Sequence, residues 1–536
     1  MPDRRRFFKV SETDTARERP HERQVIGALG AIGAATLTSR VLGFARDMLV
    51  ALVFGAGPVT DAFFVAFRIP NILRRLLAEG ALSTAVIPVF SDYAVNRSRE
   101  DLVRMLRAVL AGALLVLGVT TLLGVLSAPW LLSLIAPGFN EPTQRGLAVL
   151  LTRVMFPYLL LVGLAAFAMG VLNSQGRFFA AALGPAVVNV GMIVAVLALA
   201  RHLQPPIVSL AIGVLVGGVG QLLVQLPSLS ALGLLVSPSR ELRHPALKRV
   251  VQLLLPAVIG LASVQVMVFV NTLLASLLPA GSISFLYYAD RVMEFPLGVF
   301  GIALASASLP AMSRLAAAGD LRGVAATLNF ALRLAIYVSA PATVGLVVLS
   351  VPITRVLFER GRFGPEDTTA TAVALVWYAV GLVGFAGARI AAQAFYAIAE
   401  PGTAVRFGAI AIVANVAAAW GLMMVMGHAG LAAASSIGAY VNLLGLLWAG
   451  RRRFGRLGGR ALAVSIARTA LACVPLALWC ALLLRLGPSG GGFAREAIWL
   501  VLAIGGGSVV FLATSAALKS PERDALWGML PWRRNR

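Results

Sequence analysis

Long apolar runs dominate this sequence, and they leave few folds open to it. Fourteen of them are long enough to cross a hydrocarbon core of about 30 Å. They lie near residues 25–44, 60–89, 108–136, 147–172, 180–200, 207–235, 250–278, 284–312, 330–351, 370–398, 404–426, 429–450, 463–485 and 496–518. Of the 536 residues, 59% are hydrophobic and only 13% are charged, which excludes an ordinary soluble globular protein. The sequence therefore predicts an all-α polytopic membrane protein with 14 transmembrane helices.

The formal net charge of +23 is unevenly distributed along the chain. Basic clusters follow the second, sixth, eighth and twelfth apolar runs, whereas the intervening connections are poorer in cations or balanced. By the positive-inside rule the basic connections are cytoplasmic, and an even number of spans then places both termini in the cytoplasm. A nucleic-acid-binding face is the alternative explanation for so basic a chain, but basic loops spaced between membrane spans argue against it.

An internal duplication organises the spans. A shift of 222 residues aligns residues 81–91 with residues 303–313, and nearby shifts bring Gly176 onto Gly402 and Asn189 onto Asn415. Two lobes of six spans each would have the same orientation, and parallel repeats of this kind are a transporter architecture. Chance similarity between helices rich in alanine, leucine and serine is the alternative explanation. The predicted organisation is a disordered cytoplasmic N-terminus at 1–24, an N-lobe at 25–235, a cytoplasmic linker at 236–249, a C-lobe at 250–450, two further spans within 451–520 and a cytoplasmic tail at 521–536.

Charged residues interrupt the first two apolar runs. They are Arg40, Arg46, Asp47, Asp61, Arg68, Arg74, Arg75 and Glu79, and the eighth run begins with Asp290, Arg291 and Glu294. A charge at mid-bilayer costs about 2.5 to 3.5 kcal/mol, so such residues usually face a protein interior or a water-filled cavity. The excess of arginine indicates an anionic cargo, because guanidinium groups stay charged and bind phosphate oxygens in pairs. The alternative is that these charges pair with one another as a gate, or lie at a membrane depth from which they reach water.

Other kinds of site find little support in the sequence. Cys473 and Cys480 lie seven residues apart on one predicted helix without a second pair, and the four histidines lie near predicted loops. This pattern indicates neither a metal site nor a disulfide. No acid/base pair lies near a recognisable nucleophile, so we predict a transporter with no catalytic residues and no cofactor.

Several of these motifs closely resemble the MurJ (MviN) lipid II flippase family. The resemblance extends from about residue 25 to 520, and the matching segments are residues 39–47, 60–71, 74–75, 78–81 and 287–296. It implies the fold of the multidrug/oligosaccharidyl-lipid/polysaccharide exporter superfamily, with a central cavity between the lobes. It also implies that the last two helices form a hydrophobic groove for a polyprenyl tail.

The resemblance also implies roles for individual residues. Those expected to bind the diphosphate and sugar headgroup, or to face its path, are Arg40, Arg46, Arg74, Arg291, Ser39 and Ser284. The charges expected in the cavity or its gates are Asp47, Asp61, Arg68, Arg75, Glu79, Asp290 and Glu294. Arg389 lies at a position that is basic in the family, but the resemblance assigns it no role.

The resulting hypothesis is a flippase in the bacterial cytoplasmic (inner) membrane. It would move lipid II, the undecaprenyl-diphosphate-linked peptidoglycan precursor, to the outer leaflet by alternating access, as a monomer among membrane lipids and cell-wall synthesis proteins. The alternatives are another polyprenyl-diphosphate oligosaccharide as substrate, or a drug exporter on the same fold. Residues 250–278 contain no acidic residue, so the sodium site of some family members finds no support here. Coupling to the membrane potential is compatible with the sequence, because moving one charge is worth about 2.3 kcal/mol per 100 mV.

Overall fold

The computed structural model describes the whole chain except residues 1–32, 34, 77–82, 242, 488–491 and 530–536. The predicted disordered terminus at 1–24 and the charged residue Glu79 therefore lie outside the described residues. Within the described part every regular element is a helix. Ten helical segments of that part are long and apolar enough to cross a membrane, judged by length and composition. The predicted class of all-α polytopic membrane protein is confirmed.

The ten segments correspond to ten of the predicted spans, namely the third to sixth and the ninth to fourteenth. Helix boundaries differ from the apolar runs where polar residues continue a helix. Helix α4 begins at Arg99, well before the apolar run at 108, because the Ser98 side chain caps it by accepting a hydrogen bond from the Asp101 amide. The helix thus extends beyond its apolar part, which hydropathy alone does not show.

The chain folds into two compact units. The first contains residues up to Leu49, 66–132 and 146–265, and the second contains residues 50–65, 133–145 and 266–536. The first half of the chain forms a helix over residues 35–54 and then α2 (Pro58–Leu73), α3 (Ser83–Asn96), α4 (Arg99–Leu126), α5 (Ala128–Ile135), α6 (Pro142–Met155), α7 (Tyr158–Ser174), α8 (Phe179–Ala182), α9 (Gly184–Leu199), α10 (Val208–Leu223), α11 (Leu226–Ala231) and α12 (Pro245–Ser276).

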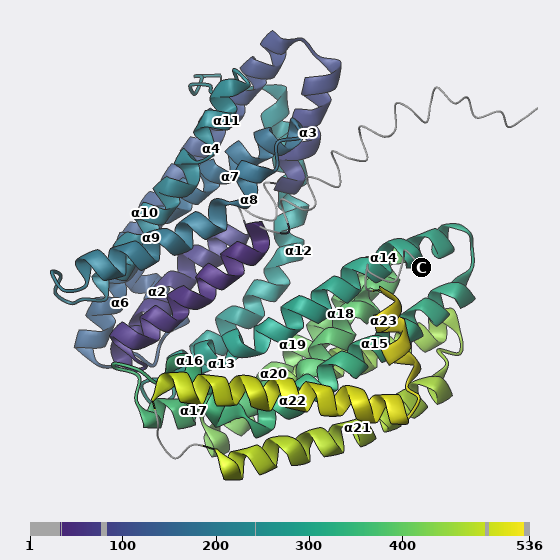
Figure 1. Cartoon of the computed structure of the whole chain (residues 1–536). Helices are drawn as coiled ribbons and strands as arrows, with labels where there is room; N and C mark the ends of the chain where they lie inside the picture. The colour runs from purple at the N-terminus through teal and green to yellow at the C-terminus, as the bar shows by residue number, and fades with distance from the viewer. Residues whose placement is uncertain (1–32, 34, 77–82, 242, 488–491, 530–536) are drawn as a thin grey trace, which may run out of the picture. The chain divides into compact units, whose positions relative to one another are not determined.

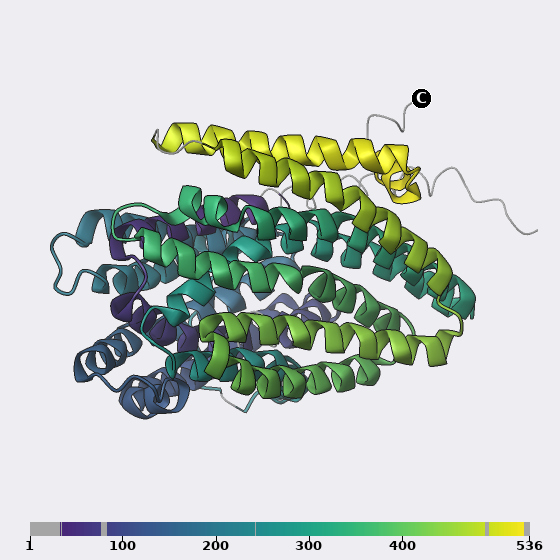
Figure 2. The same cartoon turned by 90° about the horizontal axis from the view of Figure 1, so that it is seen from below.

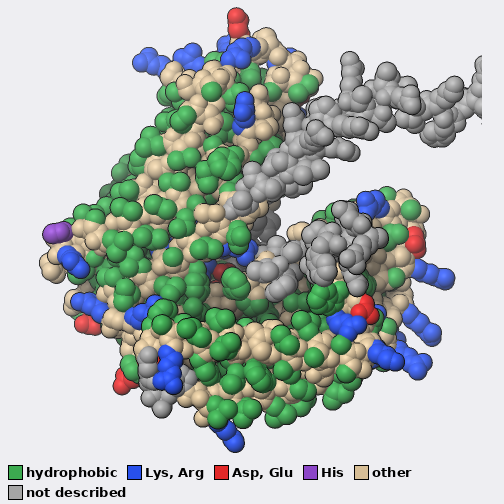
Figure 3. All heavy atoms as spheres, in the orientation of Figure 1, with side chains coloured by type: hydrophobic (Ala, Val, Ile, Leu, Met, Phe, Trp, Pro, Cys, Tyr) green, Lys and Arg blue, Asp and Glu red, His purple; other side chains and the backbone are tan. Residues whose placement is uncertain are grey.

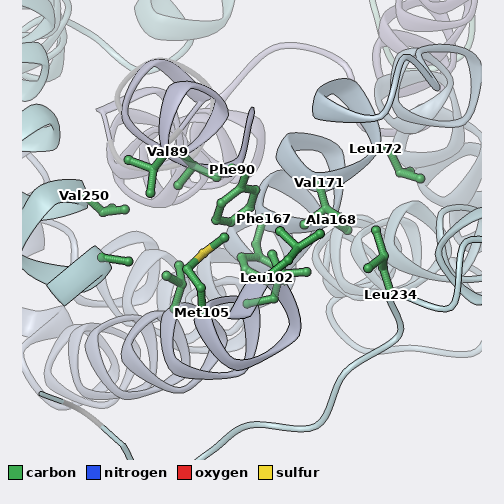
Figure 4. Packing of buried hydrophobic residues seen from close by; sticks show 14 of the residues in the cluster. Val89, Phe90, Leu102, Met105, Phe167, Ala168, Val171, Leu172, Leu234 and Val250 are labelled. Carbon is green, nitrogen blue, oxygen red and sulfur yellow. The ribbon is translucent and has the colours of Figure 1, made fainter. Parts of the chain in front are cut away.

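The core of the first unit lies between α3, α4 and α7 (Figure 4). The rings of Phe90 and Phe167 meet edge to face with their centroids 5.6 Å apart, and Met105 lies beside them. Helices α9 and α10 pack with their backbones in close contact. A Cβ atom on Gly191 would lie 2.6 Å from the Cα atom of Gly217, so the two backbones touch in a way that only glycine permits.

The second unit contains the remaining helices (Figure 1). They are α13 (Ser282–Pro296), the π-helical turn η2 (Leu297–Gly301), α14 (Ile302–Ala317), α15 (Leu321–Val348), α16 (Ser350–Phe358), α17 (Pro365–Val380), α18 (Leu382–Ala397), α19 (Pro401–Met426), α20 (His428–Phe454), α21 (Gly459–Leu486), α22 (Phe493–Ala517) and α23 (Pro521–Met529). Helices α21 and α22 run side by side along one side of this unit, and α21 packs on α15 (Figure 2).

The outer faces of these helices suit a lipid environment. On α21 and α22, Leu478 is 65% exposed and Val501 is 69% exposed. In Figure 3 hydrophobic side chains cover most of the visible sides of the helices, whereas most of the visible Lys and Arg side chains lie near helix ends. This distribution agrees with a membrane protein whose polar groups face the aqueous boundaries.

Both charged motifs of the sequence lie next to a proline and a π-helical turn. Helix α2 contains Pro70 and continues into a π-helical turn at residues 74–76, and α13 ends at Pro296 and continues into η2. Proline removes one backbone donor and crowds the preceding turn of the helix, and π-helical turns are often found at functional sites. The two motifs therefore occupy locally irregular helices.

Candidate substrate-binding arginines

Arg46 is the most firmly held arginine of the predicted set in the first unit. Its Nε and Nη2 atoms donate to the Asp47 carboxylate at 3.0 and 2.6 Å, and its Nη1 atom donates to Asn189 Oδ1 at 3.0 Å. The side chains of Arg46 and Asp47 are 12% and 3% exposed. The carboxylate compensates the buried cation, and the amide fixes the plane of the guanidinium. In this structure the Asp47 carboxylate therefore fixes the orientation of the Arg46 guanidinium.

Asn189 of α9 contacts the helix over residues 35–54 at a second point, in addition to Arg46. Its Nδ2 atom donates to the Ser39 carbonyl at 3.1 Å, and a Cβ atom on Gly43 would lie 3.4 Å from the same nitrogen. Ser39 itself is half-buried, whereas Arg40 is exposed on the surface of its helix. Asn189 of α9 therefore lies close against this helix beside Gly43.

Arg74 lies on the π-helical turn that follows α2. Its Nε and Nη2 atoms donate to Asn71 Oδ1 at 2.9 and 2.7 Å, and it also forms a hydrogen bond with Tyr158. Tyr158 lies near both Arg46 and Arg74, so these two arginines belong to one region of the unit. Arg68 is half-buried on α2, and Arg75 is exposed.

In the second unit, Asp61 holds the beginning of α13. Its carboxylate accepts hydrogen bonds from the Gly281 amide at 2.6 Å, the Ser284 amide at 2.8 Å and the Ser284 hydroxyl at 2.6 Å. Asp61 is 2% exposed and Ser284 is fully buried. In this structure Asp61 caps α13, and Ser284 is a donor of the capped first turn. A negative charge at a helix N-terminus is stabilised by the helix dipole and the unpaired amides.

Arg291 stands further along α13 among polar and aromatic groups. Its Nη1 atom donates to Glu294 at 2.7 Å, and its guanidinium lies 4.9 Å from the ring centroid of Tyr287. The Tyr287 ring stacks on Phe64 at 3.9 Å. Asp290 is half-buried on the same helix, and Glu294 also interacts electrostatically with Arg389 of α18. Arg389 therefore lies near the carboxylate that Arg291 binds, which the sequence did not show.

Each unit thus brings several predicted residues together around arginine. Such clusters can bind an anion through charge-assisted hydrogen bonds from guanidinium groups, which suit phosphate oxygens. Sequence reasoning missed the contact of Asn189 with Arg46, although the internal repeat had drawn attention to Asn189. Among the described residues, no group of three or more His, Cys, Asp or Glu side chains is placed to hold a metal ion.

Comparisons with known proteins identify the family. The family model described as "Lipid II flippase MurJ" matches residues 50–489. A protein of Burkholderia cenocepacia named lipid II flippase MurJ is 38% identical over 467 residues, which cover 85% of this chain and 90% of that protein. A probable lipid II flippase MurJ of Vibrio cholerae is 39% identical over 425 residues, covering 77% of this chain and 80% of that protein.

Solved structures agree with the sequence comparisons. A structure described as lipid II flippase MurJ in an inward closed conformation has a TM-score of 0.76 at 25% identity and covers 92% of this chain and 99% of that one. An inward-facing multidrug resistance MATE family transporter of the MOP superfamily has a TM-score of 0.65 at 17% identity, covers 81% of this chain and 99% of that one, and shares only the fold. The family match, the long alignments and the fold together show that this chain belongs to the MurJ family of lipid II flippases.

Proposed function

We propose that this lipid II flippase binds the diphosphate of its substrate through Arg40, Arg46, Arg74 and Arg291, and that alternating access carries the headgroup from the cytoplasmic to the outer leaflet. The observation that carries the proposal is the orientation of Arg46 by Asp47 and Asn189. A cation held in this way at membrane depth has already lost its conformational freedom, so little more is lost when it binds a phosphate.

The finer topology supports this direction of transport. We propose 14 spans in two lobes at 25–235 and 250–450, with Ser39 and Ser284 facing the substrate path in at least one state of the cycle. The basic connections support a cytoplasmic position for both termini, by the positive-inside rule. No covalent step is required, because the chain is a transporter and not an enzyme. The membrane potential is the energy source we propose, since the moving parts and the substrate carry charge.

The working cycle requires the arginines to bind the substrate differently in the two states. A ligand shifts a conformational equilibrium only by its difference in affinity for the two states. We propose that the remaining charges of the set serve the cavity or its gates; they are Asp47, Asp61, Arg68, Arg75, Glu79, Asp290 and Glu294. Two contacts of the second unit support this role, because Asp61 caps α13 and Glu294 pairs with Arg291.

The test replaces Arg40 and Arg46 separately by alanine in a cell depleted of its own flippase. We expect loss of growth and accumulation of lipid II in the inner leaflet, read by a leaflet-resolved lipid II assay. Arg201→Ala is the matched control, because Arg201 is an exposed arginine in the connection after α9. Normal lipid II translocation by the folded Arg40→Ala and Arg46→Ala variants would refute the assignment of these arginines.

A further inference from the structure

A large groove in the second unit is lined by none of the arginines assigned to the substrate. It has a volume of about 1220 Å³. It is lined by the first half of α15, the last turns of α20, the first turns of α21 and the beginning of α23. The connection between α20 and α21 forms part of its wall. That connection is one of the basic segments that the positive-inside rule places on the cytoplasmic side.

The groove carries a strong excess of positive charge. Five arginines and one glutamate line it. The glutamate, Glu522, is already compensated, because Arg333 binds its Oε1 atom at 2.6 Å through Nε and the Ser465 hydroxyl donates to the same oxygen at 2.9 Å. The other four arginines have no carboxylate within ion-pair distance among the described residues; they are Arg451, Arg456, Arg460 and Arg468.

The first turn of α21 adds unpaired donors to this charge. Gly458 precedes the helix with φ of 65° and provides no side-chain cap, so the amides of the first turn lack the partner that a serine or aspartate would supply. Asn329 fixes this turn by donating to the carbonyls of Leu457 and Gly458 at 2.7 and 3.2 Å. A helix N-terminus flanked by arginines favours a phosphate group.

An apolar wall lies next to these donors. Leu332, Leu447, Val464 and Trp448 line the same groove, and Trp448 is 53% exposed. The Arg452 guanidinium lies 3.8 Å from the Trp448 ring centroid, so an aromatic ring and a cation meet at this end of α20. Tryptophan with arginine is typical of the membrane–water boundary. A ligand that suits both walls has an anionic head and hydrocarbon tails.

We propose that this groove binds an anionic glycerophospholipid of the surrounding bilayer. Its phosphate lies among Arg451, Arg456, Arg460 and the first turn of α21, and its acyl chains lie along Trp448. Basic pockets between transmembrane helices on the cytoplasmic side bind anionic lipid headgroups by this combination of charge and apolar surface. The bound lipid is a component of the bilayer and is distinct from the transported substrate.

The test measures binding of phosphatidylglycerol and phosphatidylcholine to the purified full-length chain by native mass spectrometry. We expect at least tenfold tighter binding of phosphatidylglycerol. The double variant Arg456→Gln/Arg460→Gln should bind it about 25-fold more weakly, since each arginine near a lipid headgroup contributes about fivefold. The control is Arg485→Gln/Arg495→Gln, which removes two exposed arginines near the other end of α21 and at the start of α22 and should leave the affinity unchanged.

Four outcomes would overturn the proposal. Equal affinity for the two lipids, or full affinity in the folded Arg456→Gln/Arg460→Gln variant, would show that the groove does not select an anionic headgroup. Displacement of phosphatidylglycerol by inorganic phosphate at the same concentration would identify a free-anion site. Displacement by one equivalent of lipid II would assign the groove to the transported substrate instead. Circular dichroism and the elution volume of each variant would confirm that it is folded.

Discussion

Replacing Asn189 by alanine tests whether Arg46 must be held in one orientation to bind substrate. The substitution removes the acceptor that lies 3.0 Å from Arg46 Nη1 and the donor that lies 3.1 Å from the Ser39 carbonyl. Asp47 still compensates the charge through Nε and Nη2. The variant therefore leaves the cation paired with Asp47 and removes one of the partners that orient it.

The size of the effect follows from the hydrogen bond to Arg46. Hydrogen bonds to charged groups contribute about 1.5 to 3 kcal/mol. Side-chain hydrogen bonds between membrane helices contribute less, about 0.6 kcal/mol on average and about 1.7 kcal/mol at most. The two ranges overlap at about 1.5 kcal/mol, which corresponds to about a tenfold change in affinity. We therefore expect Asn189→Ala to weaken lipid II binding about tenfold.

The assay compares lipid II dissociation constants of purified variants with lipid II translocation in depleted cells. Asn415→Ala is the matched control. Asn415 is a fully buried asparagine on α19 whose recorded side-chain hydrogen bond goes to the Ser435 hydroxyl at 3.4 Å. The Asn415→Ala variant should lose some stability and keep the wild-type affinity for lipid II. Wild-type affinity in a folded Asn189→Ala variant, or an equal loss in both variants, would refute the positioning role of Asn189.

Three further substitutions test other contacts. Arg291→Lys should reduce lipid II translocation at least tenfold without unfolding the chain, because an ammonium group cannot reproduce the planar guanidinium contacts; unchanged translocation would contradict this. Arg333→Met should lower the free energy of unfolding by about 3 to 5 kcal/mol, because it leaves the buried Glu522 without its counter-charge; thermal unfolding in detergent measures it. The hydrogen bond from Arg104 holds the pKa of Glu241 below its usual value, so this pair stabilises the fold above about pH 4.3 and loses its effect as the pH falls through the lower folded-state pKa. The Tm difference between wild type and Glu241→Gln should therefore be present at pH 6 and vanish in strong acid.

Ten of the fourteen predicted spans correspond to long apolar helices of the described residues, because the apolar run of such a helix is visible in the local sequence. The ends of a membrane helix are harder to predict from the sequence. The first turns of α4 consist of polar residues stabilised by the Ser98 cap, and hydropathy cannot distinguish such turns from a loop. Pro70 and Pro296 each disturb the hydrogen bonding of the helix that contains them. Whether the helix then forms a kink or a π-helical turn depends on the packing around it.

The candidate site was predictable as a set of charges and not as a set of contacts. Arg46 and Asp47 are neighbours in sequence, so their pairing could be expected. The Asn189 partner of Arg46 lies 143 residues away, and the amide that binds Asp61 most closely lies 220 residues away. A single sequence contains no pattern that joins such distant positions. The role of Asp61 as a helix cap therefore required the fold.

The close approach of α9 and α10 has a consequence for substitutions that never touch an arginine. A methyl group on Gly191 would meet the Gly217 backbone at 2.6 Å, so the two helices must separate to admit it. Asn189 lies two residues from that contact, and a displacement of α9 would carry its amide away from Arg46. A single added carbon atom could then abolish transport, although no substrate-binding residue is assigned to α9 or α10. A search for loss-of-function substitutions should therefore include this glycine interface beside the charged residues.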